Sequence, residues 1–325
     1  MVLPSATQIA ELNRSGHFDP AWYRKAYPDV DLAGLDPALH YLCYGHRLGR
    51  NPGPSFDTRF ARMVYKIADE QEPLAWLERQ RKRHGRPVQP DAQVVLQAAS
   101  SVAQQGDHAH AISLARNHLR ADLAYTLNIL KANAAIAAGD EVSWQRHLNH
   151  YLEHYALAPI RLNGSGPLLQ RLSTAPLAPV TDGPLVTVIM TAWNAEGTVQ
   201  AAATSILRQT WRNLELLIVD DCSTDNTWQI LRQIAASDQR VKVFRNAANV
   251  GTYVSKTIAS TQAKGEWLTG HDADDWAHPE RLARHLNFCL REGVNATMAG
   301  MLRATPKGEF SQINPIGGFV YDGAC

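Results

Sequence analysis

The fold is decided in residues 185–221, which read LVTVIMTAWNAEGTVQAAATSILRQTWRNLELLIVDD. Two apolar, β-rich runs, 185–190 and 214–219, flank a segment with helical spacing at about 197–208. The same alternation continues downstream, with strand-like or helix-like segments at 226–236, 241–244 and 279–291. Because apolar strands separated by helices form parallel sheets covered on both faces, we expect an α/β fold with a mostly parallel sheet from residue 184 onward.

Polar side chains follow the strands of this predicted sheet, where such sheets bind their ligands. Thr191 and Asn194 follow the first strand, and Asp220 and Asp221 follow the second. The run GHDADDWAHPERL (270–282) comes after another short strand and places acids at positions 272, 274 and 275. Carboxylates this close repel one another unless a cation lies between them, and Mg²⁺ or Mn²⁺ prefers such oxygen ligands. The alternative is an acidic turn before the helix that begins near Pro279.

Composition limits the class of protein. The chain has 325 residues, 45% of them hydrophobic, and a formal net charge of +1, which predicts about two soluble domains and no nucleic-acid partner. The sequence shows no apolar run long enough for a membrane span and no signal peptide, so we expect a cytoplasmic protein. The cysteines share no metal-ligand spacing and are expected to be reduced thiols: Cys43, Cys222, Cys289 and Cys325.

The part of the chain before the α/β domain is expected to be helical. Gly106-Asp107 and Gly139-Asp140 are helix stops about 33 residues apart, the period of a helical-hairpin repeat that resembles the tetratricopeptide class. The first ninety residues are rich in aromatics, proline and glycine, which predicts a small module of short helices. The predicted parts are 1–90 (helical module), 91–160 (helical hairpins), 161–183 (Pro/Gly-rich linker) and 184–325 (α/β domain).

Four motifs in order carry a resemblance to a known family. They lie at 186–199, 214–227, 249–268 and 271–282. Together they resemble the nucleotide-sugar-binding half of family 2 glycosyltransferases of the GT-A fold, a Rossmann-like sheet. The resemblance covers roughly residues 184–310. Segment 18–57 also resembles, less specifically, a module found ahead of bacterial surface-polysaccharide transferases.

The resemblance implies a nucleoside-diphosphate sugar as donor, with UDP as the first choice, and Mn²⁺ or Mg²⁺ as cofactor. The cation would stabilise the diphosphate leaving group. In the pattern Asp272-Ala273-Asp274, a DXD motif, Asp274 would be the direct metal ligand. Asp272 would complete the metal shell or contact the ribose.

The same resemblance assigns the base and diphosphate contacts. Asp221 would accept the uracil N–H, with Asp220 in support, and Trp193 would stack on the base. Lys256 stands where many members carry Arg and would contact the diphosphate. Each residue also has a local alternative: strand-end turns for Thr191 and Asn194, a helix cap for Asp220, the core for Trp193, and a solvated helix face for Lys256.

The catalytic base of an inverting transferase lies on a later segment in this family. Only Asp322 follows Glu309 as an acid, so Asp322 is the one candidate, and the chain reads as C-terminally truncated. We therefore expect donor binding with poor transfer to a glycan or lipid-linked acceptor in bacterial capsule, exopolysaccharide or lipopolysaccharide synthesis, at the inner face of the inner membrane. The alternative is a non-catalytic donor-binding or scaffold protein. The helical region is the candidate for peripheral membrane association or for a protein partner.

Overall fold

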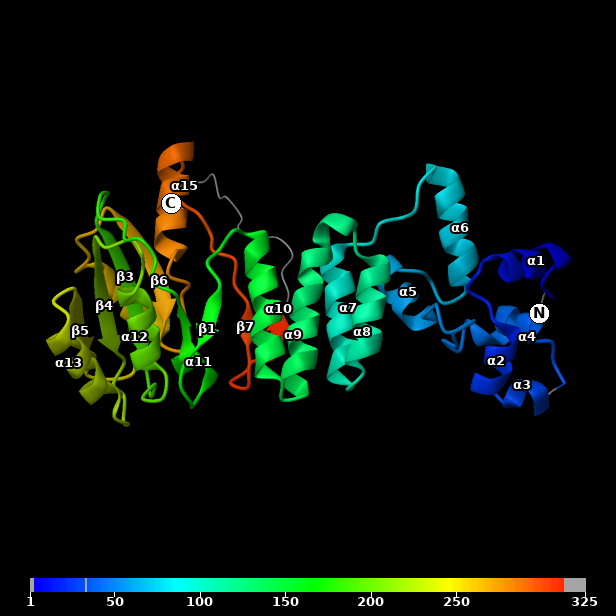
Figure 1. Cartoon of the computed structure of the whole chain (residues 1–325), viewed down its shortest axis with the longest axis horizontal. Coiled ribbons are helices and arrows are strands. Elements are labelled where there is room, and N and C mark those ends of the chain that lie inside the picture. The colour runs from blue at the N-terminus through cyan, green and yellow to red at the C-terminus, as the bar shows by residue number, and fades with distance from the viewer. Residues whose placement is uncertain (1–2, 33, 313–325) are drawn as a thin grey trace. The chain divides into compact units, whose positions relative to one another are not determined.

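The computed structural model describes residues 3–32 and 34–312 (Figure 1). The described residues divide into two compact units, one formed by the residues up to 138 with 310–312 and the other by 139–309. The first unit is helical apart from one short strand, and the second contains a parallel sheet. The expected order, a helical region followed by an α/β region, is therefore confirmed.

The first unit contains nine helices and one strand within the described ranges. They are α1 (Ala6–Arg14), α2 (Pro20–Ala26), α3 (Asp29–Leu32), α4 (Pro37–His40), α5 (Thr58–Tyr65), α6 (Pro73–His84), α7 (Ala92–Gln104), α8 (His108–His118), α9 (Leu127–Ala137) and β8 (Phe310–Gln312). A π-helical turn at 41–45 continues α4, and a 3-10 turn at 121–126 precedes α9.

The aromatic residues of the N-terminal module form its core. Tyr23 and Tyr41 are fully buried together with Leu12 and Val30. The Tyr23 hydroxyl lies 3.0 Å from Nδ1 of the buried His40, so the polar tip of this core ring is satisfied. The aromatic residues noted in the sequence therefore contribute to the core of this module.

The two Gly-Asp pairs have a direct structural reason. Gly106 and Gly139 end helices with φ of +93° and +75°, which glycine adopts without steric cost. The aspartate that follows each glycine then caps the next helix, since Asp107 accepts from the His110 amide and Asp140 from the Ser143 amide. The pairs therefore mark tight turns between helices, and in the first unit α7 and α8 pack together.

The second unit holds the remaining helices and strands of the described chain. They are α10 (Glu141–His154), β1 (Ile160–Leu162), α11 (Leu168–Arg171), β2 (Leu172–Thr174), β3 (Val186–Ala192), α12 (Val199–Leu207), β4 (Leu214–Asp220), α13 (Thr227–Ser237), β5 (Val241–Arg245), α14 (Thr252–Ser260), β6 (Trp267–Asp272), α15 (Arg281–Glu292) and β7 (Arg303–Ala304). No helix of the described residues is long and apolar enough to cross a bilayer.

The main sheet has the strand order β5-β4-β3-β6, and all three pairings are parallel. Every residue of β3 and β4 is buried, as expected for central strands covered on both faces. One face packs in a cluster with α12, α13 and α15, and the other contacts α14 (Figure 1). The predicted sheet and its covering helices are therefore present.

Glu215 connects the strands at the end of the sheet where they begin. This buried carboxylate accepts from the Thr187 hydroxyl (2.7 Å) on β3 and from the Lys242 ammonium (3.1 Å) on β5. It also accepts from the Lys264 amide (2.7 Å), three residues before β6. Burial acts to raise the pKa of Glu215, but these hydrogen bonds outweigh it and hold the pKa below its usual range. One side chain thus ties β4 to β3, to β5 and to the approach to β6.

The segment 161–183, expected to be a linker, carries ordered structure. β1 and β2 pair antiparallel, with Ile160 opposite Thr174, and α11 lies between them. Arg171 forms a bidentate ion pair with Glu141 of α10, at 2.7 and 2.8 Å. Three-residue strands are too short to leave a periodic pattern, so the Pro- and Gly-rich composition did not reveal them.

Candidate donor site

The parallel register brings the predicted site residues to one edge of the sheet. Thr191 of β3 is the partner of Asp272 of β6, and Ala192 is the partner of Asp220 of β4. Because these strands run in the same direction, their carboxyl ends meet, and the loops that follow them lie beside one another. Sequence positions 191–194, 220–223 and 272–275 therefore share one edge.

Asp221 is held by the loop that follows β5. Its carboxylate is buried and accepts from Asn246 Nδ2 (2.8 Å), the Val250 amide (2.9 Å) and the Gly251 amide (2.8 Å). Burial acts to raise the pKa of Asp221, yet these donors outweigh it and lower the pKa. Oδ1 already takes two of the hydrogen bonds and Oδ2 only one, so Oδ2 retains acceptor capacity for a further N–H.

Asp220 is paired rather than free. Its side chain is fully buried, and Oδ2 lies 3.0 Å from Nε of Arg245, the partner strand's last residue. The Arg245 guanidinium also donates to the Ser223 carbonyl and lies 5.5 Å from the Trp228 ring centroid. Oδ1 of Asp220 accepts from the Ser223 amide (3.3 Å), so the contacts of this acid lie within the turn after β4 and at Arg245.

Trp193 and Asn194 form the turn after β3. Trp193 is 58% exposed, so it is not a core residue and its ring is open to a ligand. Asn194 has φ of +48°, a left-handed conformation that asparagine adopts more readily than most residues. Its backbone amide donates to Ser223 Oγ (3.0 Å), and its Oδ1 accepts from the Thr224 amide (2.8 Å). Asn194 thus joins the two loops, while Thr191 is buried beneath them.

Lys256 contacts an acid of the cluster directly. Its ammonium lies 2.8 Å from Oδ1 of Asp272, and the two side chains are 32% and 52% exposed. Lys256 lies on α14, which packs against β3 and β4, so the helix carries the ammonium to the carboxyl end of β6. Lys256 is therefore paired with an acid of the 272–275 cluster, and its contact with a diphosphate stays a prediction.

The acids at 272, 274 and 275 influence one another. Asp272 and Asp274 are exposed at the strand end, and the Asp275 amide donates to the Asp272 carbonyl (3.1 Å) in a tight turn. Desolvation, followed by the negative charges of Asp274 and Asp272, raises the pKa of Asp275. The two neighbouring carboxylates thus add negative charge beside Asp275, which a cation would offset.

A resident metal cage is not present in the described part of the chain. No group of three His, Cys, Asp or Glu residues there could hold a metal ion. Two carboxylates such as Asp272 and Asp274 instead fit a cation that takes its other ligands from a bound diphosphate and water, the usual arrangement for Mg²⁺. The metal roles of Asp272 and Asp274 therefore stay predictions.

Several neighbours of the site were not identified from the sequence. Asn246 and Gly251 hold Asp221, and Gly251 does so with φ of +84° at the start of α14. Arg281, largely desolvated, donates to the Thr269 hydroxyl and to a backbone carbonyl, both at 2.8 Å. The NVG run at 249–251 was the signal for Gly251, and Asn246 had none. Asp322 lies outside the described residues.

Comparisons with known proteins agree on the α/β part of the chain. Residues 187–315 match the family model described as Glycosyl transferase family 2. An uncharacterised glycosyltransferase of Haemophilus influenzae is 36% identical over 114 residues, which is 35% of this chain and 46% of the relative. The Escherichia coli protein WfaP, a UDP-Glc:alpha-D-GlcNAc-diphosphoundecaprenol beta-1,3-glucosyltransferase, is 34% identical over 110 residues, 34% of this chain and 43% of the relative.

The chain spans less than half the length of these curated relatives. Among solved structures, Staphylococcus aureus TarS 1–349 in complex with UDP is similar with a TM-score of 0.34 and 26% identity. That match covers 37% of this chain and 36% of the TarS chain.

Proposed function

We propose that the chain binds a UDP-sugar together with Mn²⁺ or Mg²⁺ and serves sugar transfer in bacterial surface-polysaccharide synthesis. The match of residues 187–315 to the Glycosyl transferase family 2 model supports this proposal. The observation that carries this proposal is the shared strand edge, where Trp193, Asp221 and the 272–275 acids lie at neighbouring strand ends. The name of WfaP, which specifies UDP-glucose, supports UDP as the nucleotide.

Each group in the site has a chemical task in this proposal. Trp193 stacks on the base, and Oδ2 of Asp221 accepts the uracil N–H with its remaining lone pair. Asp274 and Asp272 would hold the divalent cation, which would supply positive charge to the departing diphosphate. The Lys256 ammonium, which is paired with Asp272 in this structure, would be within reach to contact a diphosphate oxygen. The transfer is inverting, and a carboxylate deprotonates the acceptor hydroxyl.

Calorimetry tests the donor site. UDP and GDP are titrated into the whole chain with Mn²⁺ and with EDTA. We expect metal-dependent binding that favours UDP, loss of metal dependence in Asp274→Ala, and weaker discrimination between the bases in Asp221→Ala. Equal affinity in EDTA and Mn²⁺ would remove the cation from the proposal, and equal affinity for UDP and GDP would remove the assignment of Asp221.

The helical region has its own proposed role. The 33-residue spacing of the Gly-Asp turns supports helical hairpins of the tetratricopeptide kind, and such repeats present surfaces to other proteins. A chain that binds UDP-sugar without multiple-turnover transfer to a lipid-linked or oligosaccharide acceptor would favour the scaffold alternative. Steady transfer would instead make Asp322→Asn the first variant to test for the base.

A further inference from the structure

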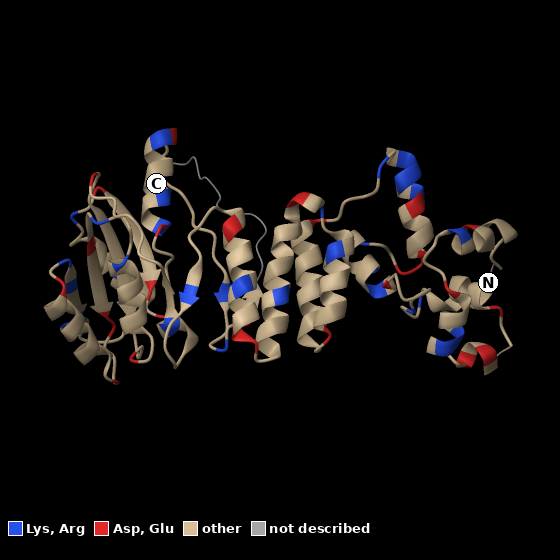
Figure 2. Cartoon of the chain, viewed as in Figure 1, with Lys and Arg blue, Asp and Glu red and all other residues tan. Residues whose placement is uncertain are grey.

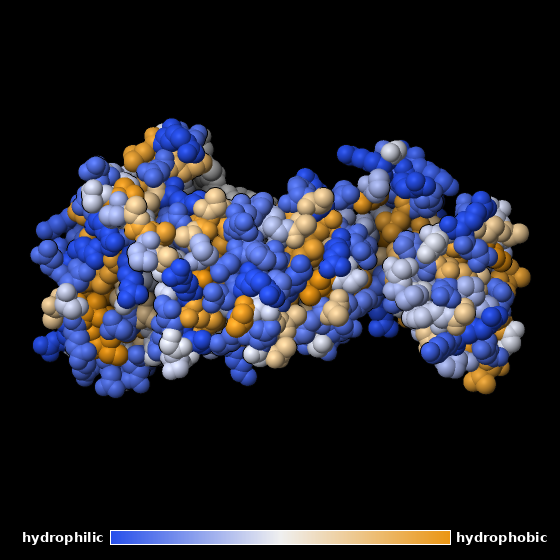
Figure 3. Space-filling model, in the orientation of Figure 1, coloured by the Kyte–Doolittle hydropathy of each residue, from blue (hydrophilic) through white to orange (hydrophobic). Residues whose placement is uncertain are grey.

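A basic segment ends α6. Residues 79–86 read RQRKRHGR and contain Arg79, Arg81, Lys82, Arg83 and Arg86. Five of the chain's 32 Lys and Arg residues thus lie within eight positions, although the whole chain carries a net charge of only +1. All five are exposed, and the blue bands and hydrophilic surface of α6 show this concentration (Figures 2 and 3).

The positive charge of this segment is largely uncompensated. Glu78 forms ion pairs with Arg81 (2.7 Å) and Lys82 (3.7 Å). Glu11 also lies 3.8 Å from the Lys82 ammonium. Among the described residues, no ion pair reaches Arg79, Arg83 or Arg86. Three guanidinium groups therefore face solvent without an acidic partner at contact distance.

Helix α6, which carries most of these cations, is stabilised at both of its ends. Glu72 caps its start by accepting from the Leu74 and Ala75 amides, and Gly85 ends it with φ of +67°. Cations in the last turn lie at the negative end of the helix dipole, which stabilises the helix rather than fraying it. Trp76 packs on Tyr65, with ring centroids 6.3 Å apart. The segment is therefore ordered because of its own sequence.

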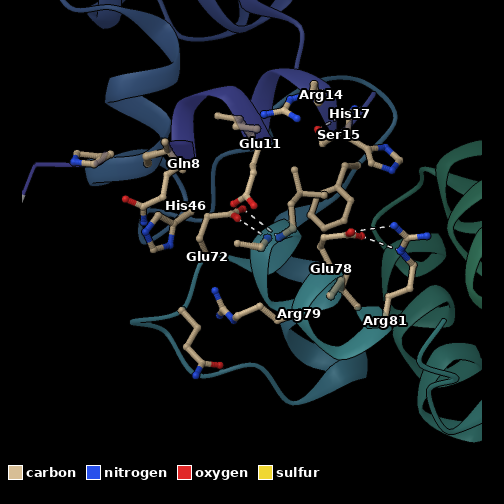
Figure 4. Close-up of a pocket in the computed structure, with 18 of the residues that line it drawn as sticks. Gln8, Glu11, Arg14, Ser15, His17, His46, Glu72, Glu78, Arg79 and Arg81 are labelled. Atoms are coloured by element: carbon tan, nitrogen blue, oxygen red, sulfur yellow. Dashed lines mark hydrogen bonds and ion pairs between the residues drawn. The ribbon is translucent and has the colours of Figure 1, made fainter. Parts of the chain in front are cut away.

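Apolar side chains accompany the charge. A groove of about 1110 Å³ runs along α1 and α6 in this unit, and its labelled polar residues are drawn in Figure 4. Its lining also includes Leu3, Pro4, Pro87 and Val88, and Leu3 is 72% exposed. A basic helix end with exposed apolar neighbours has the two components by which peripheral proteins bind an anionic bilayer.

We propose that the basic segment and the adjoining apolar residues dock this chain on an anionic phospholipid surface. Binding to an anionic lipid surface requires only positive charge and a few apolar side chains that can insert. A single-stranded nucleic acid would in addition need aromatic rings for base stacking, and Trp76, the aromatic residue of α6, is already packed on Tyr65. The site is independent of the donor site on the sheet.

Vesicle co-sedimentation of the whole chain tests this surface. The probes are phosphatidylcholine vesicles and the same vesicles with 30% phosphatidylglycerol, each at low and high salt. We expect binding only to the anionic vesicles, weakened by salt because exposed charges are screened. The triple variant Arg79→Gln/Arg83→Gln/Arg86→Gln should bind about a hundredfold more weakly, at about fivefold per cation.

A matched variant removes the same net charge elsewhere. Arg116, Arg161 and Arg232 are exposed and form no ion pair with described residues, so the triple Gln variant at these positions should keep vesicle binding. Circular dichroism establishes that both variants fold. Wild-type chain that does not prefer anionic vesicles, or equal losses in the two variants, overturns the proposal. Binding to a single-stranded oligonucleotide but not to vesicles also overturns it.

Discussion

The substitution Asp221→Asn tests how the site is built, because it keeps the side chain's shape and removes its charge. An asparagine keeps one acceptor oxygen where the carboxylate has two. If that oxygen stays with Asn246 and Val250, the Gly251 amide loses its acceptor. The two hydrogen bonds that remain lose their charge assistance.

The magnitude follows from these three contacts. A hydrogen bond to a charged group contributes about 1.5–3 kcal/mol, roughly twice a neutral one. Losing one bond and halving two others comes to about 3 kcal/mol at the lower end. The lower end applies because Val250 and Gly251 are exposed, so water can reach their amides after the substitution.

Hydrogen exchange measures this effect where it occurs. A loss of about 3 kcal/mol predicts exchange of the Val250 and Gly251 amides about a hundredfold faster or more, if they exchange through opening of this loop. Asp182→Asn is the control, because Asp182 is exposed and none of the described residues donates a hydrogen bond to its carboxylate; it should change stability by less than about 0.5 kcal/mol. Unchanged exchange in Asp221→Asn would refute the reasoning.

The pH dependence gives the same test a second form. The pKa of Asp221 is lowered in the folded chain from an ordinary value of 3.8. The stabilisation is therefore fully present above pH 3.8 and is lost as the pH falls through the lower folded pKa. Wild-type loop protection should decline only in that acid range, and the Asp221→Asn chain should lack this decline.

Three further predictions concern the sheet and the cation site. Gly265→Ala should destabilise the chain by about 1–3 kcal/mol in urea unfolding, because the new Cβ would lie 2.5 Å from the Thr187 backbone nitrogen; a neutral result would contradict this close packing. Glu215→Gln should lower stability at neutral pH and remove a stabilisation that wild type loses as the pH falls below 4.5, since the folded pKa of Glu215 is lowered; acid titration of the melting temperature checks this, and parallel curves would exclude it. Lys256→Met should strengthen Mn²⁺ binding without nucleotide, because Asp272 loses its competing ammonium, and should weaken binding of the Mn²⁺–UDP complex; calorimetry that shows the same change in both titrations would argue against this role.

The parts of the fold that the sequence predicted are those with long, uniform patterns. β3 and β4 are seven-residue runs that are buried throughout and mostly apolar, so each gives a continuous β-rich signal in the sequence. β1, β2 and β7 have only two or three residues, and no periodicity can be detected over that length. Their existence depends on tertiary contacts such as the Arg171–Glu141 ion pair.

The candidate site shows the same limit. The acids at strand ends could be located from the sequence because a parallel sheet gathers its carboxyl ends. The partners of those acids could not, since Asp221 meets Val250 and Gly251 across about 30 positions and Lys256 meets Asp272 across 16. These contacts depend on how β5 and α14 are placed relative to the sheet, and no local sequence pattern indicates that placement.

Glu215 holds the strands together at the end of the sheet that does not carry the site. Its contacts with Thr187, Lys242 and Lys264 join the strands at their beginnings, opposite the edge that carries the site. The register of the strands therefore does not depend on the loops at the other edge. Exposed residues of the site edge, such as Trp193 and Asp274, can therefore be substituted without touching the contacts of Glu215 that hold the strands together.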